Sequence, residues 1–253
     1  DGRRCSSAVA YLRPAMHRKN LTVLTNTQAL RVIFEGTRAV GVEVETDGNT
    51  QTIKASREIV LSSGAIGSPQ LLMVSGVGPT EHLSEHGIST HRVLPGVGQN
   101  LQDHLQARPV YRCTASTINV EVNSLFKKAL IGVQYALTRT GPMAMAASLG
   151  AGFLKSHPNL DAPDIQFHVQ PFSKSNMSNA APDSFSAFTA SVLQLRPEST
   201  GQLRLRSADM REYPSLQPNY LATENDQRTL VEGIRVARKI SRFEPLSQFV
   251  TAE

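Results

Sequence analysis

The spacing of apolar and polar residues divides the first third of the chain into a helix, a series of strands and a second helix. Residues 6–18 have helical spacing, and Pro14 marks a bend or an end of that helix. Residues 20–63 change to the period of strands. The predicted strands in this stretch are rich in β-branched and aliphatic residues and cover residues 22–25, 29–34, 39–45, 50–55 and 58–61. This pattern predicts an antiparallel meander that ends in one core strand.

A turn at Gly64 separates the last of these strands from a short apolar helix. Ser68 is the predicted N-cap and Pro69 the first helical residue, where a missing N–H is tolerated, so we expect the helix over residues 69–74. The start of a helix offers unpaired backbone N–H groups and the positive end of the helix dipole to an anion. The turn therefore predicts a phosphate or nucleotide site, although an ordinary strand-to-helix turn needs the same small residues.

The rest of the chain predicts a sheet with flanking helices. The strands are expected over residues 107–113, 149–154, 165–170, 185–195 and 202–206. Helices are expected over residues 122–137 and 225–243. The first of these helices carries one apolar stripe, which consists of Leu125, Ala129, Leu130, Val133, Ala136 and Leu137. We therefore expect an α/β half over residues 1–105 and an α+β half, built on an antiparallel sheet, over residues 106–253.

Charge and composition narrow the classes of function. The net charge of +5 comes from scattered Lys and Arg residues, a pattern that argues against nucleic-acid binding. No run of about 18 apolar residues predicts a membrane span. The two cysteines, Cys5 and Cys113, suggest neither a metal knuckle nor a disulfide framework and favour a reducing compartment. The cytoplasm is therefore favoured, while localisation and oligomeric state stay open.

One short motif has the spacing of a metal site. His82-Leu83-Ser84-Glu85-His86 matches the H-x-x-E-H pattern of inverted zinc proteases, with both imidazoles on one helix face. No third ligand in a helical setting follows, and Gly87 ends the helix at once. We interpret the motif as a solvated helix end and expect no metal.

Several segments together resemble one family of enzymes. Residues 64–78 match, at every defined position, the second signature of the glucose–methanol–choline (GMC) oxidoreductases, and the similarity runs nearly from end to end. Further segments that are similar to the family are Asp1-Gly2-Arg3-Arg4, residues 98–104, 163–168, 196–199, 201–209 and 218–221. Within the family, these segments are similar to the branch of choline dehydrogenases and bacterial alcohol dehydrogenases. Two family features are missing here: the Gly-x-Gly-x-x-Gly turn and the segment with the catalytic His.

The resemblance implies a fold and a set of cofactor contacts. It implies part of an FAD-binding domain over residues 1–105 and an incomplete substrate domain over residues 106–253. It places Ser62, Ser63, Gly64 and Ala65 beside the ribose and pyrophosphate of FAD. A second group of implied contacts comprises the backbone of Ala29 at the adenine ring and the loop that contains Asn100, Gln102, Asp103 and His104, which would lie over the flavin or at the domain junction. The alternatives are a plain strand position for Ala29 and structural hydrogen bonding for the loop.

His168 is the candidate substrate contact. Gln166, His168 and Gln170 alternate with apolar residues, so strand geometry places the three on one face of the sheet. In the GMC family that sheet forms the floor of the substrate pocket. The alternative is a sheet face that helices or solvent cover.

The resemblance also implies an activity. The complete enzyme would oxidise an alcohol to an aldehyde or ketone, with hydride transfer to the flavin. We expect this chain to be an internal piece of such an enzyme, inactive by itself and without its own FAD. A stand-alone binding or oligomerisation module of the same fold is the alternative. The alcohol and the electron acceptor, oxygen or a quinone, are not indicated.

Overall fold

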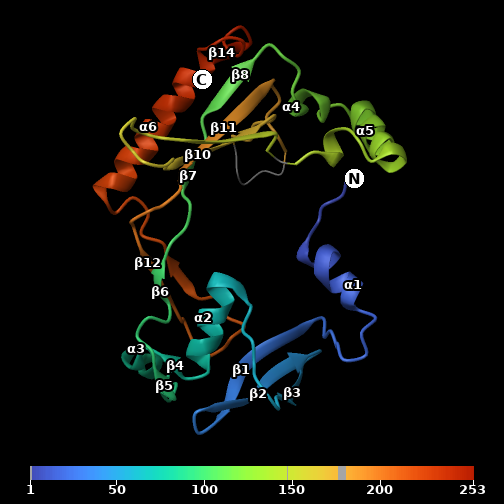
Figure 1. Cartoon of the computed structure of the whole chain (residues 1–253). Helices are drawn as coiled ribbons and strands as arrows, with labels where there is room; N and C mark the ends of the chain where they lie inside the picture. The colour runs from blue at the N-terminus through green and yellow to red at the C-terminus, as the bar shows by residue number, and fades with distance from the viewer. Residues whose placement is uncertain (1, 147, 176–180) are drawn as a thin grey trace. The chain divides into compact units, whose positions relative to one another are not determined.

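The computed structural model describes residues 2–146, 148–175 and 181–253. They form two compact units (Figure 1). The first, here called the meander unit, consists of Pro14–Asp103 and Ser199–Ala222. The second, called the sheet unit, consists of Asp1–Arg13, His104–Glu198 and Thr223–Glu253. The chain therefore returns to the meander unit after residue 198, a crossing that the sequence pattern did not indicate.

Three antiparallel strands open the meander unit: β1 (Thr27–Glu35), β2 (Arg38–Thr46) and β3 (Asn49–Lys54). The turn between β2 and β3 has Asp47 and Gly48 in left-handed backbone conformations, which the Asp-Gly step favours in tight hairpin turns. Residues 22–25 form no strand. The short helix η1 (Ala8–Leu12) and α1 (Arg13–Ala15) precede the meander.

The core of the meander unit lies between α2 (Gly64–Val74), α3 (Thr80–Glu85) and β12 (Gly201–Arg204). Its fully buried side chains are Met73, Leu83, Leu203 and Leu205. The strands β6 (Gln99–Leu101) and β13 (Ser215–Gln217) pair with β12 on its two sides. Two short parallel strands, β4 (Val77–Gly78) and β5 (Arg92–Val93), flank α3.

The expected core strand over residues 58–61 is not formed. The segment runs from β3 to α2 without a strand partner in the described part of the chain, and Val60 is 74% exposed. An apolar run becomes a strand only where a neighbouring strand takes up its backbone hydrogen bonds. The composition of this segment favours a strand, but no strand forms because no neighbouring strand in the described part of the chain pairs with it.

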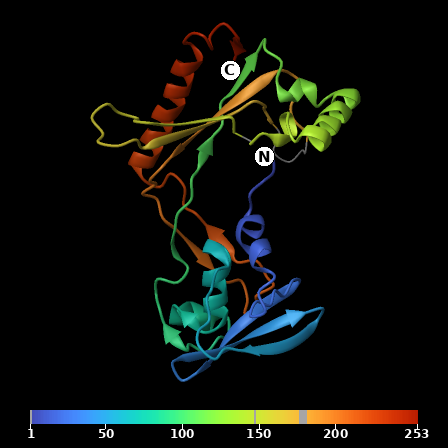
Figure 2. The ribbon, with the colours of Figure 1, turned by 45° about the vertical axis from the view of Figure 1, so that its right-hand side comes forward.

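A six-stranded antiparallel sheet forms the sheet unit. Its main path runs β14 (Val250–Ala252), β8 (Val110–Cys113), β11 (Ala187–Gln194), β10 (Ile165–Gln170) and β9 (Gly150–Leu154), and β7 (Gln106–Ala107) also pairs with β11. The helix α6 (Glu224–Ser241) packs on β11 and β10 (Figure 2). Thr223 caps α6 by accepting the Asp226 N–H at 3.2 Å, so the helix begins one residue before the expected residue 225.

Close packing holds α6 against the sheet. A Cβ atom on Gly233 would lie 2.5 Å from Cγ2 of Val192, so the absence of a side chain there lets the helix approach β11. The remaining helices of this unit are α4 (Ile118–Glu121), α5 (Leu125–Thr138) and the 3₁₀ turn η2 (Pro142–Ala144). None of the helices in the described part of the chain is long and apolar enough to cross a lipid bilayer.

Candidate functional site

The start of α2 differs from its prediction. The helix begins at Gly64, after Ser63, and Pro69 therefore lies inside it. The Ser68 hydroxyl does not cap at its own position but accepts the backbone N–H of Ser63 at 3.0 Å. Gly64 has φ +76, a conformation that favours glycine and lets the chain turn directly from the extended segment into the helix. The predicted N-cap at Ser68 is thus wrong, because the glycine turn starts the helix earlier.

This early start exposes polar backbone at the first turn of α2. The four predicted cofactor residues Ser62, Ser63, Gly64 and Ala65 are all exposed, and the preceding Leu61 is half-buried. No side chain caps the first N–H groups. Pro69 has no N–H to donate to the carbonyl four residues back, that of Ala65. The turn therefore offers free donors and one free carbonyl acceptor to a bound molecule.

A hollow of about 480 Å³ lies beside this turn within the meander unit. It brings together Ala65 and Asn100, two predicted cofactor residues that are far apart in the sequence. The other lining residues are Ser68, Pro69, Leu72, Gly96, Val97, Gly98, Gln99, Leu101, Gln102 and Leu203. No charged side chain is among these described residues. Their role toward a cofactor stays a prediction.

Gly98 shapes the far wall of the hollow. Its φ is +81, and a Cβ atom at this position would lie 2.4 Å from the carbonyl oxygen of Leu203. The Leu203 N–H in turn donates to the Gly98 carbonyl at 2.6 Å. Only glycine lets the loop close on β12 in this way. Asn100 follows with φ +57, which asparagine tolerates better than most residues. The Gly-x-Gly step at Gly96 and Gly98 is the feature of the sequence that could have indicated this wall.

Ala29 lies elsewhere in the meander unit. It is half-buried in β1, next to a register shift between Ala29 and Arg31, and it does not line the hollow. Three residues further along β1, the Val32 N–H donates to Ser75 Oγ at the end of α2, at 2.8 Å. The Ser75 hydroxyl in turn donates to the Leu71 carbonyl. The structure therefore does not group Ala29 with the other candidates.

The polar residues after Asn100 make structural hydrogen bonds. The Asp103 carboxylate accepts the hydroxyl of Tyr220 within the meander unit, and this hydrogen bond is the main reason that the pKa of Tyr220 is raised. In the sheet unit, His104 Nε2 bonds the Leu195 carbonyl at 3.0 Å. This pattern matches the structural alternative for these two residues.

His168 lies on β10 with its neighbours arranged as the alternation predicted. It pairs with Ser191 of β11 and Ala151 of β9, so the three side chains share one face. His168 is half-buried, and the fully buried Ser191 hydroxyl makes no hydrogen bond within the described residues. Of the two, the half-buried imidazole is the group that a polar group of a ligand can reach, because the Ser191 hydroxyl has no exposed surface. Assignment to a substrate stays a prediction.

The opposite face of the same sheet holds an apolar hollow of about 470 Å³. Phe167 and Val169, the two neighbours of His168 in β10, point to this opposite face and line the hollow together with Ala237 and Ile240 of α6. Gly150 and Gly152 pair with Val169 and Phe167 and leave this face of β9 without side chains at these two positions, whereas Leu154 of the same strand lines the hollow. The hollow and His168 are thus on different faces and do not form one site.

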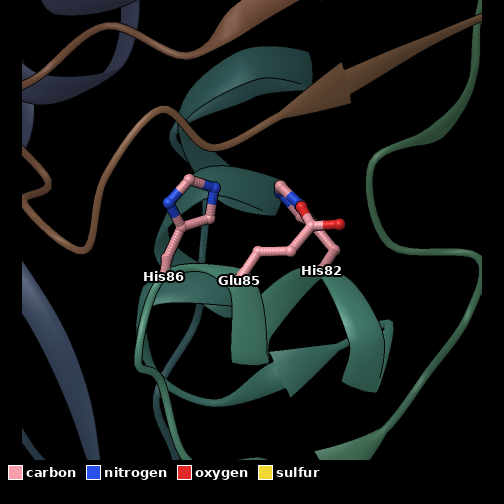
Figure 3. Close-up of side chains that lie close together, drawn as sticks. All are labelled: His82, Glu85 and His86. Carbon is pink, nitrogen blue, oxygen red and sulfur yellow. The ribbon is translucent and has the colours of Figure 1, made fainter.

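The His82, Glu85 and His86 group is shown in Figure 3, with ligand atoms that lie within 4.8 Å of one another. However, His82 already uses both ring nitrogens. Its Nε2 accepts the backbone N–H of Leu205 at 2.9 Å, so Nδ1 carries the proton and donates to Glu85 at 3.0 Å. Glu85 also pairs with Arg204 at 2.7 Å. A metal on Nδ1 would require the proton to move to Nε2, against the Leu205 N–H.

These contacts explain the electrostatics of Glu85. The hydrogen bond from His82 lowers the pKa of Glu85 most, and Arg204 lowers it further. The group therefore serves to fasten α3 to the end of β12. The motif does lie at the end of α3, but the interpretation as a solvated helix end is wrong for His82, which is buried because it accepts the Leu205 N–H in the core.

Solved structures share this fold over nearly the whole chain. A crystal structure of formate oxidase superimposes with a TM-score of 0.86 at 27% identity, covering 94% of this chain and 46% of that one. Pyridoxine 4-oxidase from Mesorbium loti gives a TM-score of 0.82 at 26% identity, covering 100% of this chain and 46% of that one. The fold is therefore that of a class of oxidoreductases, and the predicted combination of a partial FAD-binding domain and an antiparallel-sheet domain is confirmed at this level.

Sequence comparisons give the family. Models of the GMC oxidoreductases match residues 1–106 and 197–251. Mouse mitochondrial choline dehydrogenase is 42% identical over 249 residues, which are 98% of this chain and 42% of that protein. Oxygen-dependent choline dehydrogenase of Brucella canis is 42% identical over 97% of this chain and 45% of that protein. The chain belongs to the GMC oxidoreductase family and spans less than half the length of the curated relatives it matches.

Proposed function

We propose that this chain is part of an FAD-dependent alcohol oxidoreductase of the choline dehydrogenase type, which oxidises an alcohol to an aldehyde or ketone. The observation that carries the proposal is the hollow at α2, which brings Ala65 and Asn100 together at a helix start with free N–H groups. The similarity to choline dehydrogenases supports the reaction class. A neighbouring structure of formate oxidase from Aspergillus oryzae is described by its FAD modification, which supports the cofactor.

The residues around the hollow fit the ribose and diphosphate part of FAD. The lining residues that the structure describes bring no negative charge, and the first turn of α2 presents backbone donors to an anion. We assign the backbone of Ser63, Gly64 and Ala65 to the diphosphate side. Asn100 would contribute its amide from the opposite wall. Ala29, which lies away from the hollow, would contribute only a backbone contact to the adenine.

The chemistry divides between the cofactor and the protein. FAD, when bound, supplies the acceptor for the hydride that leaves the carbinol carbon. The protein holds and orients the reactants. His168, with the Ser191 hydroxyl beside it, would hydrogen-bond a polar group of the alcohol on its face of the sheet. We assign no proton-transfer role to the described residues, and we expect the 253-residue chain alone to be inactive.

A flavin-binding and turnover assay tests the proposal. The longest polypeptide encoded by the gene would be purified and assayed for bound FAD and for dye reduction with choline and with simple primary alcohols. Ala65→Glu places a carboxylate in the hollow and should lower FAD affinity by at least about tenfold, since one charge repulsion of this kind is worth about 1.4 kcal/mol or more. Ala208→Glu, at an exposed position of the same unit, is the matched control.

The outcomes separate the alternatives. Alcohol-dependent dye reduction that Ala65→Glu lowers and Ala208→Glu preserves would support the proposal. A polypeptide that carries no flavin and reduces no dye would overturn it and favour a binding or oligomerisation module. FAD binding that is unchanged by Ala65→Glu would overturn the assignment of the hollow while leaving the family unaffected.

A further inference from the structure

Gln70 is a buried polar residue on the side of α2 that faces away from the hollow. Ala65, Ser68, Pro69 and Leu72 line the hollow, and their spacing of three and four residues places them on one side of the helix. At about 100° per residue, Gln70 projects from the opposite side, and it is only 5% exposed. A buried amide costs free energy unless it is hydrogen-bonded, so its partners show what the residue does.

The partners of Gln70 come from the loop that joins β12 to β13. Its Nε2 atom donates to the Glu212 carbonyl at 2.7 Å and to the Met210 carbonyl at 3.3 Å. A glutamine amide has two N–H groups to donate, and one loop accepts from both. The two acceptors are 140 and 142 positions further along the chain, so the contact connects α2 to a distant hairpin of the meander unit.

The loop that receives Gln70 is itself held in place. The Asp209 carboxylate accepts the backbone N–H of Arg211 at 2.9 Å, and the Asp209 carbonyl accepts the N–H of Glu212 at 3.1 Å. The guanidinium of Arg211 pairs with Asp209 at 2.9 Å and with Glu45 of β2 at 3.1 Å. These contacts present the two carbonyls to Gln70 in a defined position.

The same hairpin supports the opposite wall of the hollow. Leu203 of β12 lines the hollow and donates its N–H to the Gly98 carbonyl at 2.6 Å. The strand β12 also lies in contact with α2 (Figure 1). The β12–β13 hairpin therefore holds α2 through Gln70 and holds the loop that contains Asn100 through Gly98. The separation of the two walls depends on this one hairpin.

We infer that Gln70 is a positioning residue for the cofactor, because it sets the distance between the first turn of α2 and the loop that contains Asn100. The inference rests on the proposed function, which assigns this hollow to the diphosphate part of FAD. Backbone N–H groups bind a phosphate oxygen only at hydrogen-bond distance, so a displaced α2 would lose donors to the cofactor. Gln70 does not line the hollow and acts only through the position of the helix.

The affinity for FAD of two variants of α2 tests the inference, in the longest polypeptide encoded by the gene. Gln70→Met keeps an unbranched side chain but removes both donors. It should lower the affinity for FAD about tenfold, the factor for one lost hydrogen bond to a charged group. Ser75→Ala is the matched control, because it removes two hydrogen bonds at the other end of the same helix. It should lower the melting temperature as Gln70→Met does but leave the affinity for FAD unchanged.

A second measurement reads the position of α2 without any cofactor. Ile66 on α2 and Leu216 on β13 are both 43% exposed, so cysteines at these positions can carry spin labels. The 253-residue chain would carry Ile66→Cys and Leu216→Cys, with Cys5→Ser to remove the exposed native thiol. Gln70→Met should shift or broaden the distribution of distances between the two labels. Ser75→Ala should leave that distribution unchanged.

The outcomes separate this inference from the proposed function. An affinity for FAD that Gln70→Met does not lower, or that Ser75→Ala lowers equally, would overturn the inference. An unchanged label distance in Gln70→Met would overturn it as well. If the unmodified polypeptide binds no flavin, the proposed function fails, and the label distances alone decide whether Gln70 holds α2 in place. Gln70→Asn, which keeps the amide on a shorter side chain, serves the same comparisons if Gln70→Met does not fold.

Discussion

His82 fixes the position of Leu205 across the core of the meander unit. Its Nε2 accepts the backbone N–H of Leu205 at 2.9 Å, and both residues are almost fully buried. This hydrogen bond joins helix α3 to the residue that follows β12, although the two partners are far apart in the sequence. The histidine of an apparent metal motif is therefore a structural link between two segments.

Replacing His82 with Ala should destabilise the protein. The buried N–H of Leu205 would lose its acceptor, and an unsatisfied buried donor costs about 1–3 kcal/mol. Urea unfolding measures the loss in free energy of unfolding. His86→Ala is the control, because the half-exposed His86 meets His82 only ring to ring at 5.0 Å, and it should change the stability by less than about 0.5 kcal/mol. Equal losses in both variants would contradict the role assigned to His82.

Added zinc should not stabilise the chain. The two ring nitrogens of His82 are engaged, so binding at the triad would break the bond to Leu205. Thermal unfolding with and without Zn²⁺ checks this, with His86→Ala as a variant that removes one possible ligand. A rise in melting temperature that disappears in His86→Ala would show that the triad binds metal after all.

Gly98→Ala should disturb the hollow at α2. The added Cβ atom would lie 2.4 Å from the Leu203 carbonyl oxygen, and the φ of +81 is unfavourable for any L side chain. We expect a loss of about 1–3 kcal/mol in the free energy of unfolding. Gly96→Ala in the same loop is the control, since its Cβ atom would meet no atom within 4 Å. If Gly98→Ala lost little stability and Gly96→Ala lost much, the contacts assigned to this loop would be wrong.

Acid should weaken the sheet unit through Asp183. Burial alone would raise the pKa of this carboxyl, but hydrogen bonds from Ser173 and Ser175 hold the pKa below its usual value. A carboxyl with a lowered folded-state pKa stabilises the fold above its unfolded pKa of about 3.9, and that contribution is lost as the pH falls through the folded-state value.

Asp183→Asn should therefore be less stable than the unmodified chain at neutral pH, and the difference should shrink below about pH 4. Urea unfolding across this pH range measures the effect. Asp161→Asn, an exposed aspartate of the same unit, should leave the acid dependence unchanged. A constant difference at all pH values would indicate lost packing in place of lost ionisation.

Gly150→Ala should stabilise the sheet unit. Its Cβ atom would point into the apolar hollow, 3.8 Å from Val169 Cβ, which is ordinary contact. Alanine in a strand is favoured over glycine by about 0.5–1 kcal/mol. Thermal unfolding measures the gain, and Gly48→Ala, where φ is +77, should lose stability. A destabilised Gly150→Ala would mean that the face of β9 is closed by other residues.

The sequence predicted most elements whose partners are local. The meander, α6 with its Thr223 cap and the polar face of β10 follow from period, turn chemistry and capping. The prediction was wrong where the outcome depended on distant partners. The segment over residues 58–61 has the composition of a strand but no strand partner in the described part of the chain. The spacing predicted the apolar stripe of α5 as one side of a helix but could not show that this side is exposed.

The candidate site was predicted in part for the same reason. Ala65 belongs to a turn that the local pattern predicted, and Asn100 lines the same hollow only because the loop after Gly98 closes on β12. That closure depends on a contact with Leu203, more than a hundred positions away, which no local pattern shows. Pro69 was expected as the first helical residue but is the sixth, because α2 begins at Gly64 and not after Ser68.

The backbone of the unpaired segment between β3 and α2 is open to pairing with strands of a second polypeptide. A second polypeptide that supplied strands on either side of Ile59 and Val60 would form backbone hydrogen bonds and cover an apolar side chain that is now in water. Binding of that kind favours the folded chain in proportion to the logarithm of the complement's concentration.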